Sequence, residues 1–558
     1  MATPTAPSTD DATPWFRRAV FYEVLLRSYA DSDGDGTGDF AGLTSKLDHL
    51  QWLGVDCLWV PPFYVSPLRD GGYDVADHTA VAPEYGTLDD FRAFLDAAHA
   101  RGIRVLVDLV LNHTSDAHPW FRASRHDPEG EYGDFYVWAD DDTGYPEVRV
   151  IFPDTEHSTW TWDEVRGQYF FHRFYSHQPD LNYDHPGVQE AMLEAVRFWL
   201  RLGVDGFRLD AVPYLYEREG TNGESLPETH AFLRRLRAVV EAEHPEAVLM
   251  CEANQWPEEL VEYLGDPALG GDECHMALHF PLMPRLYLAL ATSSAAPISE
   301  ILARTPKIPD RTQWGLFLRN HDELTLEMVT PAERDLMWAT YAPEPRMVAN
   351  VGIRRRLAPL LDNDRRRIEL MHSLLLSLPG SPVLYYGDEI GMGDDIWLGD
   401  RDGVRTPMQW DDGPNGGFST AAPEQLTLPV VDDPAHAPAA VNVAAQLANP
   451  ASLLHWVRDT LAVRRELPEL AVGEYTEPDG DNPAVLAFVR STDDAATLCV
   501  HNLAGTAEAV RLDLAAWAGS GPVEPRGGER FPRIGTEPYQ VTLPPYGQLW
   551  LRLTHDPG

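Results

Sequence analysis

Eight short apolar runs, separated by longer amphipathic stretches, constrain the fold of this chain more than any other feature. The runs lie at residues 20–26, 55–60, 103–109, 204–210, 247–252, 274–280, 314–319 and 382–386. Helical patterns between them include residues 89–100, 188–202, 228–243 and 364–378. Such alternation is typical of parallel βα units, and eight units close into a TIM-type barrel whose active site lies at the strand carboxyl ends. The sequence therefore predicts an α/β protein with a (β/α)8 barrel.

Two connections in this pattern are too long for ordinary loops between a strand and a helix. The first follows the third run, and its residues 112–184 are rich in Trp, Tyr, Phe and His. We expect this segment to form an inserted subdomain that overhangs the barrel mouth. The second connection covers residues 320–362 after the seventh run. We expect it to form a lid-like insertion.

After residue 467 the pattern changes to short alternating strands separated by turns that contain Gly and Pro. The strands are expected at 484–490, 496–503, 510–514, 539–543 and 548–553, which indicates a C-terminal antiparallel β-sandwich domain. The expected domains are a flexible tail (1–14), the first part of the barrel (15–111), the inserted subdomain (112–184), the second part of the barrel (185–467) and the C-terminal β-sandwich (468–558).

Composition excludes several classes of function. Apolar residues make up 44% of the chain, enough for a large core, and the net charge of −43 opposes binding to nucleic acid or anionic membranes. The N-terminal residues lack the pattern of a signal peptide, and no apolar run is long enough to span a bilayer. Four cysteines without metal-ligand spacing are expected to be buried thiols: Cys57, Cys251, Cys274 and Cys499. These features favour a cytoplasmic enzyme with a neutral substrate.

Three acidic residues stand at the ends of predicted strands. Asp210 ends the fourth run, Glu252 ends the fifth, and Asp322 follows the seventh. Arg208 lies two positions before Asp210, so both side chains point to the same side of the strand. A single Asp at such a junction can cap a helix, and a single Arg–Asp pair can be structural. Three acids that converge on one barrel mouth favour acid–base and nucleophilic chemistry instead.

These residue types match the requirements of glycosidic bond cleavage. A retaining enzyme uses an ionised carboxylate as nucleophile and a protonated carboxyl as acid, about 5 Å apart. We expect Arg208 to lower the pKa of Asp210 and keep it ionised. Glu252 follows an apolar strand, where burial raises the pKa of a carboxyl towards use as a general acid.

Four motifs, taken in order, resemble the signature regions of glycoside hydrolase family 13, the α-amylase family. They are Asp108-Leu-Val-Leu-Asn-His113, Gly206-Phe-Arg-Leu-Asp210, the strand end at Glu252, and Asn320-His-Asp322. Two further motifs are similar to those of the family's branch for small oligosaccharides, namely Gln178-Pro-Asp-Leu-Asn182 and Arg405-Thr-Pro-Met-Gln-Trp410.

A narrower resemblance extends over nearly the whole chain. Its segments are Phe21-Tyr-Glu-Val, Ser66-Pro-Leu-Arg-Asp, Glu252-Ala-Asn-Gln-Trp-Pro257 and residues 210–220, 279–284, 320–328 and 354–361. They resemble family members that interconvert maltose and trehalose by reversible intramolecular glucosyl transfer, with minor hydrolysis to glucose. An α-glucosidase or oligo-1,6-glucosidase-like hydrolase is the alternative, because the catalytic motifs are shared. A non-catalytic relative, such as a transporter subunit, would need a membrane anchor and normally lacks these acids.

The resemblance implies roles for individual residues. Asp210 is the nucleophile, Glu252 the acid/base and Asp322 the stabiliser of the transition state. Residues implied in substrate binding are Tyr73, Asp74, His113, Gln178, Arg208 and His321. In this set Tyr73 is a stacking platform, and Asp74 grips the far side of the glucose ring. Candidates for the lid or the acceptor site are Arg149, Tyr214, Asn254 and Glu327.

Two metal sites are expected. A Gly-rich loop places oxygen ligands at alternating positions, which suits a hard cation, although a solvated acidic turn is the alternative. The resemblance implies Ca²⁺ there, with Mg²⁺ as an alternative, bound by Asp31, Asp33, Asp35, Thr37 and Asp39. It also implies a second Ca²⁺ site that ties the subdomain to the barrel through Asn112, Asp180, Tyr214, Leu215 and Glu217. No organic cofactor is expected.

The expected partners are small molecules, maltose and trehalose, without nucleic acid or membrane. The resemblance implies a homo-oligomer, either a dimer or a tetramer. Some members of the subgroup carry a fused maltokinase domain, whereas this chain ends after the β-domain. A separate maltokinase is therefore a further expected partner.

Overall fold

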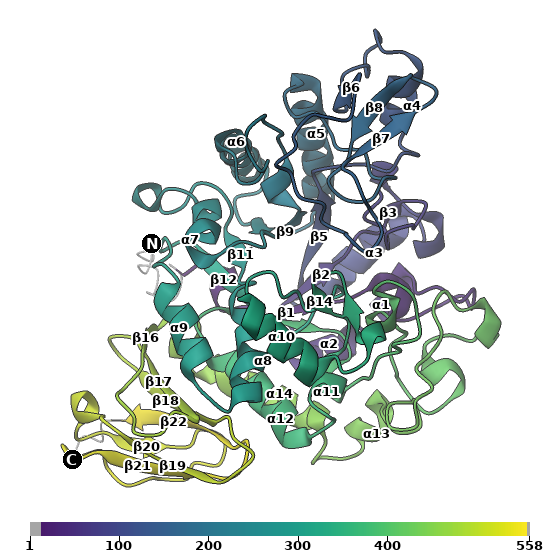
Figure 1. Ribbon diagram of the computed structural model, residues 1–558. Helices are drawn as coiled ribbons and strands as arrows, with labels where there is room; N and C mark the ends of the chain where they lie inside the picture. Colours follow the sequence, from purple (N-terminus) through teal and green to yellow (C-terminus); the bar gives the residue numbers. More distant parts are fainter. Residues whose placement is uncertain (1–12, 555–558) are drawn as a thin grey trace, which may run out of the picture.

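The computed structural model describes residues 13–554, and a closed barrel of eight parallel strands lies at its centre (Figure 1). In chain order the strands are β1 (Phe21–Glu23), β2 (Cys57–Val60), β5 (Arg104–Val110), β9 (Gly206–Asp210), β10 (Val248–Cys251), β11 (Met276–Leu278), β12 (Gln313–Phe317) and β15 (Ser381–Tyr385). Each predicted run supplies one strand, so the prediction of a (β/α)8 barrel is confirmed. The predicted tail lies outside the described residues except for Thr13 and Pro14.

The register of the barrel aligns the carboxyl ends of neighbouring strands. Val110 of β5 pairs with Asp210 of β9, and Leu209 pairs with Cys251 of β10. All five residues of β9 are buried, as expected for a parallel strand inside an α/β barrel. Glu252 directly follows β10, and its backbone N–H donates to the carbonyl of Leu209. The register therefore brings Asp210 and Glu252 to the same end of the barrel.

Helices surround the barrel where the sequence predicts them. The four predicted helices are α3 (Leu88–His99), α5 (Pro186–Leu202), α6 (Pro227–Glu243) and α12 (Arg365–Ser377). The ends of α5 follow from its sequence, because Pro186 occupies its first turn and Gly203 ends it with φ of 106°. Further helices are α1 (Phe40–Ser45), α2 (Leu47–Leu53), α7 (Pro257–Leu260), α8 (Leu282–Thr292), α9 (Ala296–Arg304), α13 (Val443–Leu447), α14 (Leu453–Glu466) and α15 (Glu469–Val472).

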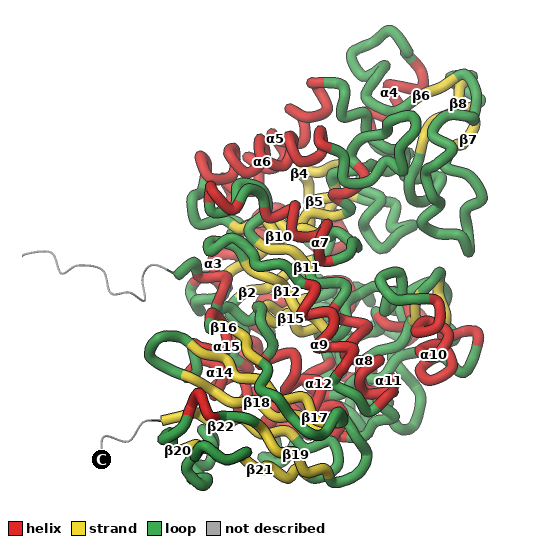
Figure 2. The backbone as a smooth tube through the Cα atoms, turned by 60° about the vertical axis from the view of Figure 1, so that its left-hand side comes forward, coloured by secondary structure: helices red, strands yellow, loops and turns green. Residues whose placement is uncertain are grey.

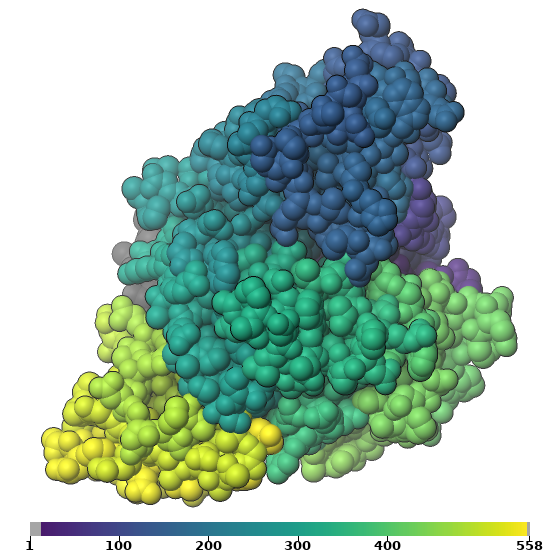
Figure 3. Space-filling model, in the orientation of Figure 1, coloured from purple at the N-terminus to yellow at the C-terminus, as the bar shows by residue number. Residues whose placement is uncertain are grey.

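Two insertions stand over the carboxyl ends of the strands. The first contains α4 (Pro119–His126) and a three-stranded sheet of β6 (Trp138–Ala139), β8 (Gln168–Phe171) and β7 (Trp160–Asp163). The second contains α10 (Pro331–Tyr341), α11 (Leu357–Leu360) and the hairpin of β13 (Val348–Ala349) and β14 (Gly352–Ile353). Figure 3 shows the blue surface of the first insertion directly above the green surface of the second. A further hairpin, β3 (Tyr64–Val65) and β4 (Asp77–Val81), follows β2.

The C-terminal domain consists of two antiparallel sheets that lie to one side of the barrel (Figure 2). The larger has the order β16 (Glu474–Thr476), β17 (Val485–Ser491), β18 (Ala496–Asn502), β22 (Gln548–Thr554) and β20 (Gly521–Val523). The smaller pairs β19 (Glu508–Leu512) with β21 (Tyr539–Leu543). Side chains of both sheets share an apolar core separate from that of the barrel, which is the arrangement of a β-sandwich. The sequence analysis missed the short strands β16 and β20.

The structure tests two expectations drawn from composition, the state of the cysteines and the absence of a membrane span. Cys57, Cys251, Cys274 and Cys499 are all free and buried, which confirms the prediction of buried thiols. Within residues 13–554, no helix combines the length and the apolar character needed to cross a bilayer.

Candidate active site

Arg208 organises the acidic residues at the centre of the site. Its guanidinium is fully buried, and Nη1 donates to Asp210 Oδ1 at 2.7 Å and to Asp108 Oδ1 at 2.6 Å. Nη2 lies 2.5 Å from Glu252 Oε2. Nη1 is also 3.2 Å from the hydroxyl of Tyr73. One cation therefore fixes the carboxylates of Asp210 and Glu252 next to each other, on the two neighbouring strands that supply them.

The pKa of Asp210 differs from the expectation. Burial raises it well above its usual range, Arg208 lowers it by less, and the negative charge of Glu252 raises it further. The pKa of Glu252 is also raised, again chiefly by burial and against the effect of Arg208. A hydrogen bond joins the two carboxyls. Arg208 thus lowers the pKa of Asp210 as predicted, but burial outweighs it, and the prediction that Arg208 keeps Asp210 ionised is wrong for this arrangement.

Asp322 has the opposite electrostatic environment. Its Oδ1 accepts hydrogen bonds from Arg401 at 2.7 Å and from Arg405 at 3.0 Å, and its Oδ2 lies 3.2 Å from His321 Nε2. Burial alone would raise the pKa of Asp322, but the neighbouring His321 and the positive charges of Arg401 and Arg405 outweigh burial and hold it below its usual range. Asp322 is therefore an ionised carboxylate at neutral pH.

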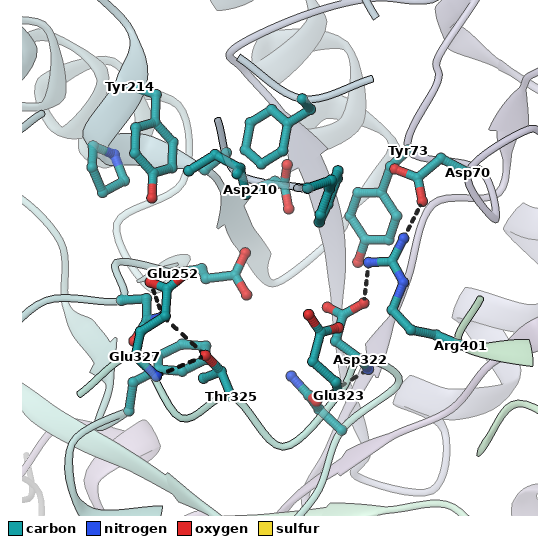
Figure 4. Close-up of a pocket in the computed structure, with 18 of the residues that line it drawn as sticks. Asp70, Tyr73, Asp210, Tyr214, Glu252, Asp322, Glu323, Thr325, Glu327 and Arg401 are labelled. Carbon is teal, nitrogen blue, oxygen red and sulfur yellow. Dashed lines mark hydrogen bonds and ion pairs between the residues drawn. The ribbon is translucent and has the colours of Figure 1, made fainter. Parts of the chain in front are cut away.

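These groups face one pocket, whose volume is about 140 Å³ (Figure 4). Apolar side chains form part of the wall: Ile151, Phe152, Phe174, Pro213 and Phe280. The polar lining contains Asp210, Glu252 and Asp322 together with acids of the second insertion, Glu323 and Glu327. Concave apolar walls with a few convergent polar groups are typical of a small-molecule site.

Two of the predicted substrate-binding residues line the pocket directly. Tyr73 does so, and its ring stacks on His321 with a centroid distance of 5.3 Å and an interplanar angle of 8°. His113 lines the pocket as well, and its buried Nε2 has no hydrogen-bond partner among residues 13–554. Burial lowers the pKa of His113 to about 3, so it is a neutral imidazole at neutral pH. An unpaired imidazole nitrogen at this wall suits a hydrogen bond to a sugar hydroxyl.

The structure corrects the assignment of Asp74. Its buried carboxylate accepts hydrogen bonds from the Ser66 hydroxyl at 2.9 Å and from the backbone N–H groups of Arg69 and Asp70 at 3.1 Å. It therefore stabilises the loop and is absent from the described lining of the pocket. Asp70, four residues earlier, faces the pocket instead.

Asp70 is held by residues from distant parts of the chain. Its Oδ1 accepts from Arg401 Nη2 at 2.6 Å, and its Oδ2 accepts from Gln178 Nε2 at 2.9 Å. Gln178 is thus placed behind Asp70 and is absent from the described lining of the pocket. Arg401 joins Asp70 to Asp322 across the pocket wall, as Figure 4 shows. The sequence analysis missed both Asp70 and Arg401, although Asp70 belongs to a quoted motif.

A polar network closes one side of the pocket rim. Arg149 of the first insertion forms ion pairs with Glu224 at 2.8 Å and with Glu327 of the second insertion at 3.0 Å. Arg149 Nη2 also donates to the hydroxyl of Tyr214 at 3.2 Å, and Asn254 Nδ2 donates to Glu327 Oε2 at 2.9 Å. The structure therefore brings together all four residues that the sequence suggested for a lid or an acceptor site.

A second contact between the insertions lies at Asn350. Its backbone N–H donates to Asp154 Oδ2 at 2.8 Å, and its side-chain amide donates to Glu323 Oε1 at 3.1 Å. Asp154 belongs to the first insertion, whereas Glu323 lines the pocket. Asn350 has φ of 49°, a left-handed conformation that Asn tolerates better than most residues.

The Gly-rich loop gathers three of its four acids. Oxygen atoms of Asp31, Asp33 and Asp39 lie within 4.8 Å of one another. Asp35 does not belong to this group, and its Oδ1 accepts the backbone N–H of Thr37 at 2.7 Å. Three carboxylates this close together suit a divalent cation with oxygen ligands.

The second predicted metal site has unsatisfied oxygen atoms. Asn112 Oδ1, Asp180 Oδ2 and Glu217 Oε1 are buried, and none has a hydrogen-bond partner in the described chain. Burial raises the pKa of Asp180 to about 7, and burial and the charge of Asp180 raise that of Glu217. Glu217 follows the turn that contains Tyr214, so the predicted carbonyl ligands are nearby in the chain. Buried oxygens without partners are costly, and a cation would satisfy them.

The fold and the site together define a class of protein: a barrel enzyme whose paired carboxyls act on glycosidic bonds. Comparison with known proteins gives the family. The family described as alpha amylase, catalytic domain, matches residues 23–341 and 344–473, and the one described as maltogenic amylase, C-terminal domain, matches residues 476–550. This chain belongs to the α-amylase family.

Several curated relatives are similar over almost the whole chain. Trehalose synthase/amylase TreS of Mycobacterium tuberculosis is 63% identical, with 98% of this chain and 91% of that protein covered. Trehalose synthase of Pimelobacter sp. is 62% identical, with 97% and 96% covered. Among solved structures, the α-glucosyl transfer enzyme XgtA is 31% identical with a TM-score of 0.78, covering 97% of this chain and 100% of that chain.

Proposed function

We propose that this protein converts maltose to trehalose, reversibly, by transferring a glucosyl group within the disaccharide. The observation that carries this proposal is a retaining carboxyl pair, Asp210 and Glu252, at the base of a pocket whose rim is closed by contacts between the two insertions. Sequence identity of 62–63% with proteins named trehalose synthase supports the same activity.

The first half of the reaction breaks the α-1,4 bond. Asp210 attacks the anomeric carbon while Glu252 donates a proton to the bridging oxygen, which leaves as a hydroxyl of glucose. The product is a β-glucosyl ester on Asp210. Because Arg208 contacts both carboxyls, entry of the bridging oxygen between them allows the proton to reside on Glu252 while Asp210 is ionised.

The second half forms the new bond. The freed glucose turns within the closed pocket until its anomeric hydroxyl faces the ester. Glu252, now a carboxylate, takes the proton of that hydroxyl, whose oxygen attacks the anomeric carbon and releases Asp210. Two inversions give the α,α-1,1 bond of trehalose.

Charged and neutral residues around the pair stabilise the transferring sugar. Asp322 stays ionised beside Arg401 and Arg405, so its negative charge stabilises the oxocarbenium-like transition state. The neutral imidazole of His113 and the carboxylate of Asp70 face the pocket from other sides and suit sugar hydroxyls. These are the roles that we assign to them.

Exclusion of water decides between isomerase and hydrolase. A glucosyl ester reacts with whichever hydroxyl reaches it first, so trehalose forms only if the glucose stays and water stays out. Arg149, Glu327 and Asn350 join the two insertions over the pocket and oppose opening. The alternative function is hydrolysis of small α-glucosides, as the names of two relatives suggest: a probable α-glucosidase of Rhizobium meliloti, 36% identical, and an oligo-1,6-glucosidase of Parageobacillus thermoglucosidasius, 30% identical.

We also propose that two Ca²⁺ ions stabilise the protein. The first site would use Asp31, Asp33 and Asp39, with Mg²⁺ as an alternative occupant, and the second would use Asn112, Asp180 and Glu217. The cation supplies positive charge that neutralises clustered carboxylates, and at the second site it would tie the first insertion to the barrel.

We also propose that the protein is cytoplasmic and forms a homo-oligomer, either a dimer or a tetramer. A separate maltokinase is its proposed partner in the use of maltose. Four buried free thiols support a reducing compartment. The exposed side chains of Trp162 and Trp397 offer apolar surface for contact between subunits.

The product spectrum from pure maltose tests the proposed function. Purified protein is incubated with maltose, and the sugars are resolved by chromatography against standards of glucose, maltose and trehalose. Trehalose as the main product, with a smaller amount of glucose, supports the proposal. Glucose without trehalose would show that the chain is a hydrolase.

A further inference from the structure

Glu23 is a buried acid beside the catalytic centre that the mechanism above does not use. It ends β1 and is fully buried. Its Oε1 lies 2.5 Å from His321 Nδ1 and also accepts the backbone N–H of His321 at 3.3 Å. Its other oxygen, Oε2, has no hydrogen-bond partner among the described residues. Within residues 13–554, His321 is therefore the only residue to which this carboxyl hydrogen-bonds.

His321 connects Glu23 to Asp322. The opposite ring nitrogen, Nε2, lies 3.2 Å from Asp322 Oδ2 but has no hydrogen-bond partner among the described residues. Stacking on Tyr73 at 5.3 Å and an edge contact with Trp59 at 6.0 Å hold the plane of the ring. Glu23, His321 and Asp322 thus lie in a row, with the imidazole in the middle and Asp322 facing the pocket.

The number of protons in this row is constrained. Asp322 is ionised and can only accept, so an attractive contact requires a proton on His321 Nε2. A neutral imidazole with that proton leaves Nδ1 as an acceptor, and a protonated Glu23 satisfies it. An imidazolium with an ionised Glu23 has the same number of protons. In both cases one proton lies between Nδ1 and Glu23, and Nε2 is a donor.

We propose that Glu23 is a positioning residue that keeps the proton of His321 on Nε2, beside the charge of Asp322 and available to a hydroxyl of the sugar. Without Glu23, the neutral ring could place its proton on Nδ1 and turn the lone pair of Nε2 against the Asp322 carboxylate. The identity of the sugar rests on the proposed function, whereas the direction of the donor does not.

The surroundings of both groups favour the neutral form of the pair. Burial and the negative charge of Asp322 raise the pKa of Glu23 well above its usual range, while Arg208 opposes this change. Burial lowers the pKa of His321 well below 6.5. The charge of Asp322 opposes this decrease, whereas the nearby cations Arg405, Arg208 and Arg401 add to it. Asp108 also faces Glu23 and raises its pKa. These shifts agree with a carboxylic acid on Glu23 that donates to His321.

Two substitutions of Glu23 separate the role in proton placement from a role in packing. In Glu23→Gln the amide N–H can still donate to Nδ1, so the Nε2–H form is kept. Glu23→Leu has similar volume and cannot donate. Glu389 supplies a matched control, because it is also fully buried, accepts one hydrogen bond from Tyr22 at 2.9 Å and has an unpartnered Oε2. It does not belong to the pocket lining.

The substrate for the test is p-nitrophenyl α-glucoside, since release of nitrophenol reports formation of the glucosyl-enzyme whatever the acceptor. We expect Glu23→Gln to stay within about threefold of the unmodified protein in kcat, and Glu23→Leu to lose about ten- to a hundredfold, the loss typical for a residue that orients a reactive group. Glu389→Leu should lower Tm without lowering kcat below about a third. In ¹⁵N-histidine NMR spectra, His321 should keep its Nε2–H form in Glu23→Gln and change in Glu23→Leu.

Three results would overturn the inference. They are full activity of Glu23→Leu, equal loss of activity in Glu23→Gln and Glu23→Leu, or an unchanged His321 spectrum in Glu23→Leu. Failure of the proposed function gives a different pattern, since the unmodified protein would then release glucose from maltose without trehalose.

Discussion

Asp210 carries the covalent step, so its removal should affect the chemistry more than the fold. Asp210→Asn keeps the size of the side chain and can still contact Arg208, but an amide does not form the glucosyl ester. We expect kcat on maltose to fall by at least about a thousandfold, with Tm close to that of the unmodified protein. Steady-state assays and thermal unfolding measure the two quantities. Substantial residual activity would assign the nucleophile elsewhere.

Asp70 and Asp74 offer a matched pair that tests the corrected site. Asp70 faces the pocket, whereas Asp74 accepts three hydrogen bonds inside the loop. We expect Asp70→Ala to lower kcat/KM for maltose by about ten- to a hundredfold, as for a lost charged hydrogen bond of about 1.5–3 kcal/mol. Asp74→Ala should mainly lower Tm and retain kcat/KM within about threefold. The reverse pattern would restore the assignment made from the sequence.

At the scale of residues, the sequence located the reactive acids but not every residue that surrounds them in the pocket. Asp210 and Glu252 follow from the ends of apolar runs, because strand ends in a barrel share one mouth. Asp74 and Asp70 lie in the same loop, and only the direction of each side chain separates them. Arg401 is 331 positions from Asp70, its partner, and no local pattern marks it. The pKa of Asp210 also depends on burial from the whole pocket, which its neighbours in sequence do not give.

At the scale of elements, the contact between the two insertions should decide the product. Asn350→Ala strains a backbone with φ of 49° whose N–H donates to Asp154 of the first insertion, and it removes the side-chain hydrogen bond to Glu323 within the second. If the closed arrangement of the two insertions loses about 1 kcal/mol of stabilising free energy, the equilibrium between closed and open forms shifts towards the open form by about fivefold. We therefore expect the ratio of glucose to trehalose formed from maltose to rise severalfold, while the rate of glucosyl-enzyme formation changes little.

Asn415 is the control for this substitution, since it has φ of 51° and is absent from the described lining of the pocket. Asn415→Ala imposes a similar backbone strain without touching the rim. It should leave the ratio of products unchanged. An equal rise in glucose for both variants would attribute the effect to general loosening of the structure and not to the rim.

The sequence predicted the elements of the barrel more fully than those of its insertions. Eight apolar runs that alternate with four amphipathic helices give strong periodic signals. The hairpin β13–β14 and the strands β16 and β20 are two or three residues long, too short for such a signal. The position of the lid followed from the length of a connection, but its contacts with Arg149 and Asp154 depend on tertiary structure.

At the scale of the whole molecule, cation binding should appear as stability. A ligand at about one hundred times its Kd stabilises the folded state by about 2.7 kcal/mol. We therefore expect chelation with EDTA to lower Tm by several degrees and added Ca²⁺ to restore it. Glu217→Gln and Asp33→Asn should each reduce the bound Ca²⁺ measured by elemental analysis by one equivalent. Unchanged Tm and metal content after chelation would contradict both proposed sites.

Buried neutral histidines should make the protein sensitive to acid. Burial lowers the pKa of His78 and His279 to about 4 and that of His501 to about 3, compared with about 6.5 in an unfolded chain. Between these pKa values the unfolded chain binds more protons than the folded protein. The contribution of these histidines to the free energy of unfolding is therefore fully present above pH 6.5 and decreases as the pH drops towards 4. Each group contributes up to about 1.4 kcal/mol per pH unit.

Thermal unfolding from pH 7 to pH 5 measures this effect. His501 lies in the C-terminal domain, where its Nε2 contacts Ser373, so its substitution leaves the pocket intact. We expect His501→Gln to show a smaller decrease of Tm with falling pH than the unmodified protein. An identical slope would show that His501 does not titrate on unfolding.

One incubation tests the central claim most directly: unlabelled maltose with an excess of ¹³C-labelled free glucose, followed by mass spectrometry of the products. Intramolecular transfer in a closed pocket predicts that trehalose is the main product and that nearly all of it is unlabelled, because the glucose released from maltose is used before it can exchange. Trehalose that carries the label in proportion to the added glucose, or glucose without any trehalose, would contradict the account.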